Sequence, residues 1–292
     1  MFTFLLTKSL PSSKLYSALN LVFPTSYGPD SLRVDHEKGV YIMGALDTYY
    51  QSVSQLFKKI TDSEQERILK GASLLADAIT KDRLIYVLGT GGHSMMGAEE
   101  MFWRAGGLVP IYPILDPGLS VLNGALRSNI VERMPGYIGP ILKYHGLAQG
   151  AILIICNAYG INSATLDAAL ECRNLGVTSL AITSTEFCKG VPPGHPSRHP
   201  SNQNLYEVAD HYINCWMPYG DAVVSISGVN QKVCPTSSMV NLFTLNCLVG
   251  ATVEELVRRG VEPPIWTSAN LPGGDEANRT HVEKYGKRIR FL

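Results

Sequence analysis

Two patterns of apolar residues alternate along the chain. In residues 41–60 and 61–80 the apolar positions recur every three or four residues, which predicts two consecutive helices. Thr61, followed by Glu64 three residues later, is a capping-box sequence that places the start of the second helix at residue 61. The same spacing predicts helices over 94–105, 163–176 and 237–260, whereas 118–147 is a mixed segment, helical in pieces.

Continuous apolar runs lie between these helices. Residues 150–157 (GAILIICN) are of the kind that a parallel strand buried on both faces shows, and 83–89, 177–185 and part of 205–216 also predict strands. Residues 108–115 predict a short strand limited by prolines. The alternation predicts an α/β fold, a doubly wound (Rossmann-like or flavodoxin-like) parallel sheet flanked by helices and preceded by two helices.

Domain organisation follows from the same pass. Residues 1–40 contain no acidic residue before Asp30 and are expected to form a peripheral or poorly ordered extension. Residues 41–292 are expected to form a single domain with an N-terminal helical pair and a lid-like C-terminal tail. The apolar stripe of 239–257 is wider than one helix face needs, so we expect a homo-oligomer, a dimer or higher, with part of this stripe at the subunit contact.

Composition narrows the possible partners. The 25 basic residues balance the 25 acidic ones, so no global field attracts nucleic acid or an anionic membrane, and any anion must be bound locally. The six cysteines include no CxxC pair, which indicates reduced thiols in a cytoplasmic protein and no zinc site. We expect no metal and no cofactor, because no His/Asp/Glu cluster has ligand spacing.

The glycine-rich turn after the first strand is the first candidate site. A strand that runs into Gly89-Thr90-Gly91-Gly92-His93-Ser94 and then a helix exposes unpaired N–H groups at the positive end of that helix. The turn is neither a Walker loop nor a GxGxxG fingerprint. Thr90, Gly91, Gly92 and Ser94 are candidate anion ligands; a tight βα turn without a ligand is the alternative.

Further hydroxyl and amide side chains follow later strands. Because the carboxyl ends of parallel strands share one edge, these turns are expected to converge with the first turn on a small phosphate held by neutral donors, with ordinary helix capping as the alternative. They contribute Asn157, Ser163, Ser184 and Thr185, and the start of the last long helix adds Thr236 and Ser237.

This pattern resembles the SIS (sugar isomerase) domain family, whose members bind phosphosugars through Ser/Thr-rich turns after successive strands. The resemblance covers about residues 41–292 and is strongest to the branch of sugar isomerase domain-containing, phosphosugar-binding proteins. Matching stretches include GHS (92–94), AEE (98–100), GALRS (124–128), LYEVAD (205–210), CPTSSMV (234–240) and the tail from Gly260. Family members perform different reactions, among them isomerisation and ether cleavage.

One departure from the family concerns the second turn. SIS proteins carry a Ser-x-Ser-Gly-like sequence there, whereas this chain has Asn157-Ala158-Tyr159-Gly160. One possibility is that the anion binds at Ser163 and the N-terminus of its helix instead of at this turn. The other is that the ligand differs from a standard phosphosugar, for example a sulfonate or a larger acidic sugar.

The chemistry is expected mainly at residues near the first turn. Aldose–ketose isomerisation needs a carboxylate base, for which Glu100 and then Glu99 are candidates, and His93 or His199 would assist ring opening. The tail residues Asn270, Asp275 and Glu276 would close over a small acidic sugar. The predicted function is a phosphosugar-binding isomerase working through an enediol; the alternatives are a non-catalytic sensor or regulatory subunit, and a lyase or etherase on the same fold.

Overall fold

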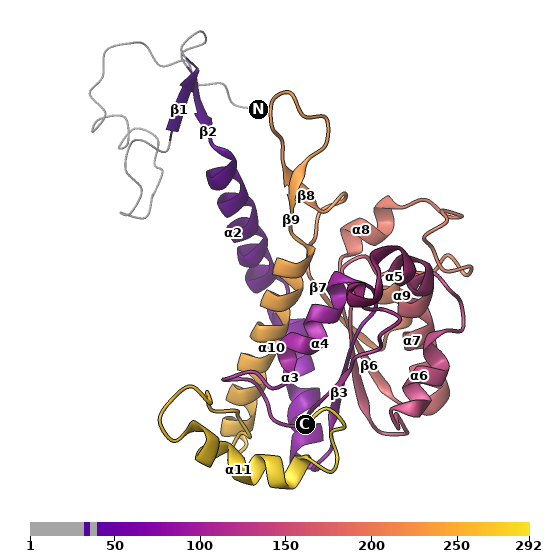
Figure 1. Ribbon diagram of the computed structural model, residues 1–292, viewed down its shortest axis with the longest axis vertical. Coiled ribbons are helices and arrows are strands. Elements are labelled where there is room, and N and C mark those ends of the chain that lie inside the picture. Colours follow the sequence, from indigo (N-terminus) through magenta and orange to yellow (C-terminus); the bar gives the residue numbers. More distant parts are fainter. Residues whose placement is uncertain (1–31, 36–39) are drawn as a thin grey trace. The chain divides into compact units, whose positions relative to one another are not determined.

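The computed structural model describes residues 32–35 and 40–292 (Figure 1). The chain divides into two compact units: residues 1–54 with 223–234, and residues 55–222 with 235–292. In the first unit, β1 (Leu32–Asp35) pairs antiparallel with β2 (Val40–Met43). Residues 41–43 are therefore a strand and not the start of a helix as predicted. Most of the predicted extension lies outside the described residues.

One helix and one hairpin are divided along the sequence between the two units. Helix α2 runs over Ala45–Ser63, and β8 (Ala222–Val224) pairs with β9 (Val233–Pro235). Thr61 lies inside α2, where its hydroxyl donates to the Lys58 carbonyl oxygen at 2.9 Å, so the predicted capping box is wrong. The Glu64 carboxylate instead accepts bonds from the Asn214 backbone N–H and the Trp216 indole N–H.

A five-stranded parallel sheet forms the centre of the second unit. Its order is β4-β3-β5-β6-β7, with β3 at Ile85–Gly89, β4 at Ile111–Ile114, β5 at Ile152–Cys156, β6 at Thr178–Thr183 and β7 at His211–Asn214. Pro113 sits in β4, which is an edge strand, because proline cannot donate to a neighbouring strand. The predicted doubly wound α/β class is confirmed, with the flavodoxin-like order.

Helices cover both faces of this sheet, so both faces are buried. One layer contains α3 (Gln65–Thr80), α4 (Met96–Met101, after the 3-10 turn η2, His93–Met95) and α10 (Ser237–Arg258). The other contains α5 (Ala125–Glu132, after η3, Val121–Asn123), α6 (Ile138–Tyr144), α7 (Ser163–Leu175) and α9 (Leu205–Val208). Side chains alternate between the two cores: Val87 and Ile154 face the first layer, Leu88 and Ile155 the second.

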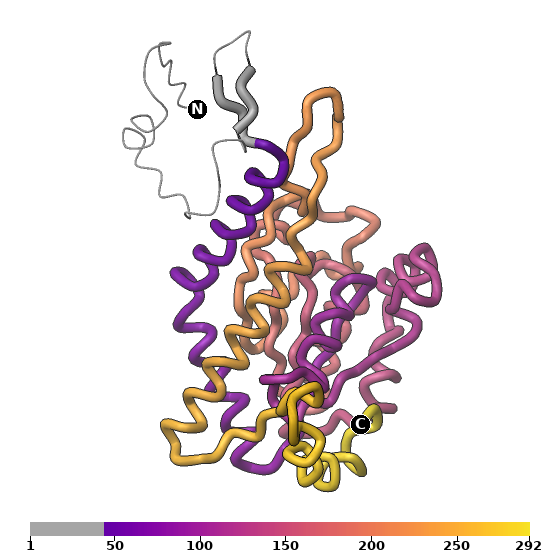
Figure 2. Tube along the Cα trace, turned by 60° about the vertical axis from the view of Figure 1, so that its left-hand side comes forward, coloured from indigo at the N-terminus to yellow at the C-terminus, as the bar shows by residue number. Residues whose placement is uncertain are grey.

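Helix α10 is long and apolar enough to span a membrane by length and composition, alone among the helices in the described ranges. It lies beside α3 and α4 (Figures 1 and 2), where Val240, Leu245 and Leu248 are fully buried. Its apolar composition is therefore largely explained by packing within the unit; Met239 and Val257 stay exposed.

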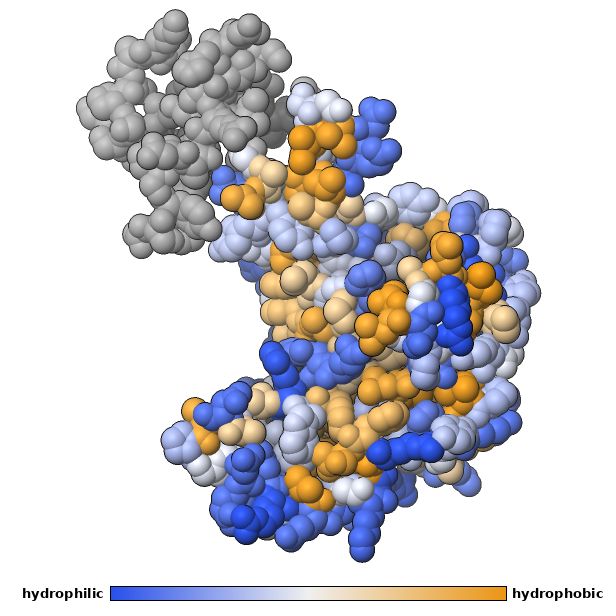
Figure 3. All heavy atoms as spheres, in the orientation of Figure 1, coloured by the Kyte–Doolittle hydropathy of each residue, from blue (hydrophilic) through white to orange (hydrophobic). Residues whose placement is uncertain are grey.

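A larger exposed apolar stripe lies on η3 and α5. Leu122, Leu126 and Ile130 are 88%, 83% and 63% exposed, and Met134 continues the four-residue spacing. Figure 3 shows exposed apolar side chains, in orange, among polar ones, in blue, on one face of the second unit. Such a stripe is typical of a surface that contacts another protein.

The C-terminal tail lies at the amino ends of the strands. Helix α11 (Gly274–Tyr285) is tied there because Lys284 and Arg288 both pair with Asp82, directly before β3. The Val109 N–H, just before β4, donates to the Pro264 carbonyl oxygen at 2.9 Å. The tail thus covers the end of the sheet at which the strands begin, and the strands end on the opposite side.

Candidate functional site

A pocket of about 730 Å³ lies at the carboxyl ends of β3 and β5. These two strands are neighbours, and the crossovers on their two sides run in opposite directions, so the pocket occupies the topological switch point of the sheet. Ligands of doubly wound proteins bind at this place because the turns diverge there. Helix α5, the short helix α8 (Thr185–Gly190), the loop after β7 and the start of α10 complete the walls.

The first turn forms the floor on one side. Gly91, Gly92, His93 and Ser94 all line the pocket. Ser94 is buried, and its hydroxyl makes no hydrogen bond within the described part of the chain. Gly91 has a φ of +110°, a conformation that residues with a side chain rarely adopt. A Cβ atom on Gly91 would lie 2.2 Å from Oε2 of Glu132, so the glycine also makes room for that carboxylate.

The second turn is closed by its own amide side chain. Oδ1 of Asn157 accepts from the backbone N–H groups of Tyr159 and Gly160 at 3.0 and 2.9 Å, and Nδ2 donates to both oxygens of Thr90. The N–H groups that a ligand oxygen would need are therefore already paired. This turn positions the first turn more than it binds a ligand.

The N-terminus of α7 is open by contrast. The N-cap residue Asn162 makes no capping bond; its Nδ2 donates to the Ser197 carbonyl oxygen at 3.0 Å. Across the pocket, Asn241 is 4% exposed, and its Oδ1 atom has no hydrogen-bond partner among the described residues. A buried polar atom without a partner is costly, which indicates that a ligand or water completes this wall.

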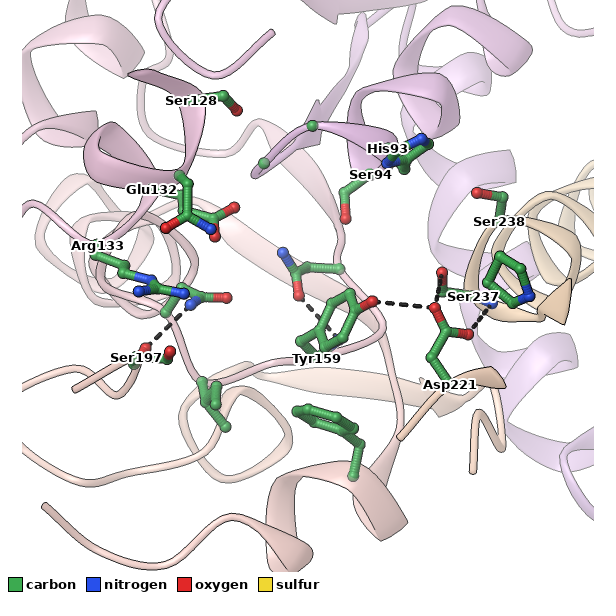
Figure 4. A pocket seen from close by; sticks show the side chains of 18 of the residues that line it. His93, Ser94, Ser128, Glu132, Arg133, Tyr159, Ser197, Asp221, Ser237 and Ser238 are labelled. Carbon is green, nitrogen blue, oxygen red and sulfur yellow. Dashed lines mark hydrogen bonds between the residues drawn. The ribbon is translucent and has the colours of Figure 1, made fainter. Parts of the chain in front are cut away.

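Asp221 organises the opposite wall (Figure 4). Its carboxylate accepts from the backbone N–H groups of Thr236 and Ser237, both at 2.7 Å, and from the hydroxyls of Ser237 and Tyr159 at 2.9 and 3.0 Å. It therefore occupies the anion position at the N-terminus of α10. Burial and Asp221 raise the pKa of Tyr159 to about 12, so this phenol stays protonated.

Glu132 is the unpaired acid of the pocket. It ends α5 and enters from the wall opposite Asp221 (Figure 4), where it is half-buried and makes no hydrogen bond or ion pair with the residues that the structure describes. Loss of hydration raises the pKa of Glu132 to about 7, because the charge of the exposed Arg133 offsets the burial only in part. A carboxyl group that titrates near neutral pH can take up and return a proton.

The structure brings six of the predicted site residues to this pocket. They are Gly91, Gly92, His93, Ser94, Asn157 and Ser237. The hydroxyls of the other predicted ligands are used in structural bonds: Thr90 with Thr165 at 2.6 Å, Ser184 with the Met217 carbonyl oxygen at 2.6 Å, and Thr185 with Asn214 at 2.9 Å. The Thr236 hydroxyl donates to the Asp221 carbonyl oxygen. Ser163, the first residue of α7, is buried and does not line the pocket.

The predicted acids and the second histidine lie elsewhere. Glu99 is exposed, and Glu100 pairs with Arg104 at 3.3 Å and accepts from Asn246 at 3.1 Å; neither lines the pocket. His199 is held by Asp167 at 3.1 Å and Ser201 at 2.8 Å.

The residues expected to form a lid belong to the tail at the other edge of the sheet. Asn270, Asp275 and Glu276 are exposed there and do not line the pocket.

Several lining residues were not found from the sequence. They are Ser128 and Glu132 from α5, Arg133 directly after it, Phe187 and Val191 near α8, Ser197 from the following loop, Tyr219 and Asp221 after β7, and Ser238 and Asn241 from α10. The available signal was the four-residue spacing of Ser128 and Glu132, which gives α5 a polar face. Among the described residues, no group of three His, Cys, Asp or Glu side chains could hold a metal ion.

Comparison with known proteins shows the family to which this chain belongs. The profile of the SIS domain matches residues 48–184. The chain is 35% identical over 247 residues to a UPF0309 protein of Geobacillus thermodenitrificans, covering 85% of this chain and 97% of the relative. A UPF0309 protein of Brucella canis is 35% identical over 246 residues, covering 84% and 98%. The protein is thus an SIS-domain protein. Within that class it belongs to the UPF0309 family.

Two solved structures were also matched. A phosphoheptose isomerase from Francisella tularensis aligns with a TM-score of 0.44 at 17% identity, over 73% of this chain and all of that one. The phosphoheptose isomerase of Neisseria gonorrhoeae aligns with a TM-score of 0.48 at 12% identity, over 72% and 97%.

Proposed function

We propose that the pocket binds a sugar phosphate and that the protein is an aldose–ketose isomerase. The observation that carries this proposal is Glu132, a carboxyl group with a pKa of about 7 beside an open turn at the switch point of an SIS-domain sheet. Isomerisation needs one group that removes a proton from the carbon next to the carbonyl and returns it to the adjacent carbon. A carboxyl group that titrates near pH 7 is suited to both steps.

The other groups of the pocket have complementary roles. The phosphate lies at the N-terminus of α7 and on the first turn, where uncapped N–H groups and the Ser94 hydroxyl are available. It does not lie at the N-terminus of α10, because the Asp221 carboxylate already occupies that end. Asn241 accepts from a sugar hydroxyl, and His93 at the rim assists ring opening.

The proposed base differs from Glu100, which the sequence favoured, and paired variants distinguish them. A thermal-shift screen of hexose, heptose and amino-sugar phosphates, with sulfonates included, identifies a ligand. Deuterium exchange at the carbon next to the carbonyl, followed by NMR, then reports proton transfer. Glu132→Gln should reduce exchange by about 10²–10⁴-fold while binding survives, and Glu100→Gln should not.

The opposite result for these variants would assign the base to Glu100. Binding without exchange by the unchanged protein would make it a sugar-phosphate sensor, and cleavage of a substituent without isomerisation would make it a lyase or etherase.

We also propose that the protein forms a homo-oligomer through the stripe Leu122, Leu126 and Ile130, in addition to the α10 contact expected from the sequence. Three neighbouring aliphatic side chains with this exposure favour burial against a second copy, since one patch can contact itself across a two-fold axis. The opposite face of the same helix lines the pocket, so such a contact would also hold Glu132 in place. A cytoplasmic location remains the prediction made from the cysteines.

A further inference from the structure

One side of the pocket is an aromatic wall. We use this name for Tyr159, Phe187 and Tyr219. The Phe187 ring stands perpendicular to that of Tyr159 with centroids 4.8 Å apart, and it stacks on Tyr219 at 5.6 Å with an interplanar angle of 27°. Ile161 and Val191 extend the wall on the same side. No charged residue belongs to it: Glu132 and Arg133 lie on the side of α5, and Asp221 contacts the wall only through its bond to the Tyr159 hydroxyl.

A hydrogen bond and a close backbone contact hold the aromatic wall in position. The hydroxyl of Tyr159 donates to Asp221 at 3.0 Å, which fixes its ring. A Cβ atom on Gly190 would lie 2.3 Å from the Tyr219 ring, so the glycine lets that ring lie against the backbone of α8. Tyr219 is nevertheless 63% exposed at the rim. An exposed ring held in position beside a pocket is a surface available to a ligand.

A plain sugar phosphate covers only part of this wall. Its phosphate is directed to the first turn and α7, and its reacting carbons must lie beside Glu132. The middle carbons are left to face the aromatic rings, and on an unsubstituted sugar they offer these rings only their C–H groups, between hydroxyl groups. The volume of about 730 Å³ lies in the upper part of the range known for ligand pockets of about 300–1,000 Å³, so there is room for more.

We infer that the ligand is a sugar phosphate with an apolar substituent, an alkyl or acyl group, on its middle carbons, and that Tyr219 and Phe187 bind this substituent. The inference rests on the proposed function for the placement of the phosphate and of the reacting carbons. It goes further because it names the chemical group that distinguishes this ligand from an ordinary hexose phosphate.

The test is a series of glucose 6-phosphates with 3-O-methyl, 3-O-ethyl and 3-O-propyl groups, compared with glucose 6-phosphate by calorimetry on the full chain. Each methylene buried on the wall should lower Kd about fourfold, equivalent to about 0.8 kcal/mol. Tyr219→Ala should reduce this gain to less than about twofold per methylene, since the ring that buries the chain is removed. Phe187→Leu, which keeps an apolar side chain, should have an intermediate slope.

Tyr144→Ala is the matched control. Tyr144 is a tyrosine 65% exposed that does not line the pocket, so its removal should leave the fourfold gain unchanged. If glucose 6-phosphate binds and the alkyl series binds no tighter, the inference is wrong while the proposed function stands. If no member of the series binds, both fail for hexose phosphates. An equal loss of slope in Tyr144→Ala would also overturn the role given to the wall.

Discussion

Replacing Gly91 by alanine tests the relation between the first turn and Glu132. At a φ of +110° an alanine is strained, which should cost about 1–2 kcal/mol of folding free energy. The new Cβ atom would also lie 2.2 Å from Oε2 of Glu132, so that carboxylate must swing away. Because a side-chain end moves more easily than backbone, we expect a folded protein with a displaced Glu132.

Gly106→Ala separates these two effects. Gly106 also has a positive φ, of +80°, but a Cβ atom there would meet nothing within 4 Å. Urea denaturation should therefore show a similar loss of stability in both variants, whereas deuterium exchange into a bound sugar phosphate should fall only in Gly91→Ala. Equal exchange in the two variants would refute the claim that Gly91 makes room for a working carboxylate. A stability loss in Gly91→Ala far above that of Gly106→Ala would contradict the expectation that the Glu132 carboxylate can swing away.

The remaining predictions concern the walls and the surface. Asp221→Asn should lower the free energy of unfolding by about 1–2 kcal/mol in urea, because α10 loses a charge at its N-terminus and one hydroxyl loses its acceptor; unchanged stability would contradict this. Ser94→Ala should weaken sugar-phosphate binding by about 1–3 kcal/mol in calorimetry, and equal affinity would move the phosphate elsewhere. Leu126→Asp should lower the sedimenting mass, and the exposed control Leu271→Asp should not; two identical profiles would exclude the stripe. Relative to Glu132→Gln, the unchanged protein should lose stability as pH rises from about 4.5 to about 7, since its folded state binds the proton more tightly; a constant difference would exclude the raised pKa.

Much of the fold was predictable because buried parallel strands leave a simple signal. Residues 150–157 are almost entirely apolar, and β5 occupies Ile152–Cys156 within them. The helix boundary at Thr61 could not be read in the same way. A capping box is a local signal. Here the Glu64 carboxylate instead accepts hydrogen bonds from Asn214 and Trp216, which are 150 and 152 residues away in sequence. Tertiary contacts decided that boundary.

The site was only half predictable for a related reason. The first turn was found because glycines between a strand and a helix have a local meaning. Glu132 was not found, because hydrophobic periodicity assigns the apolar face of a helix to the core. In α5 this rule holds for Val131 but not for Leu126 and Ile130, which face outward while Ser128 and Glu132 face the pocket. A helix that faces a polar pocket on one side and carries an exposed apolar stripe on the other cannot be oriented from one sequence.

Ser184 and Thr185 were expected among the phosphate ligands, but in the structure their hydroxyls have other partners. They follow the end of β6, and helix α8 at that strand end does reach the pocket through Phe187. The hydroxyls of Ser184 and Thr185, however, bond to Met217 and Asn214. A pattern of apolar runs gives the strand ends but not which side chains of the following turn face the pocket.

The pH dependence of kcat/KM tests the central claim, that Glu132 is the proton-transferring group, most directly. The account predicts that kcat/KM for the sugar phosphate selected by the screen rises with pH through an apparent pKa of about 7, because the working form of the base is the carboxylate. Glu132→Gln should abolish this limb and leave a low, flat profile, while Glu100→Gln keeps it. A limb near the ordinary carboxyl value, about 4.3, or one that persists unchanged in Glu132→Gln, would contradict the account.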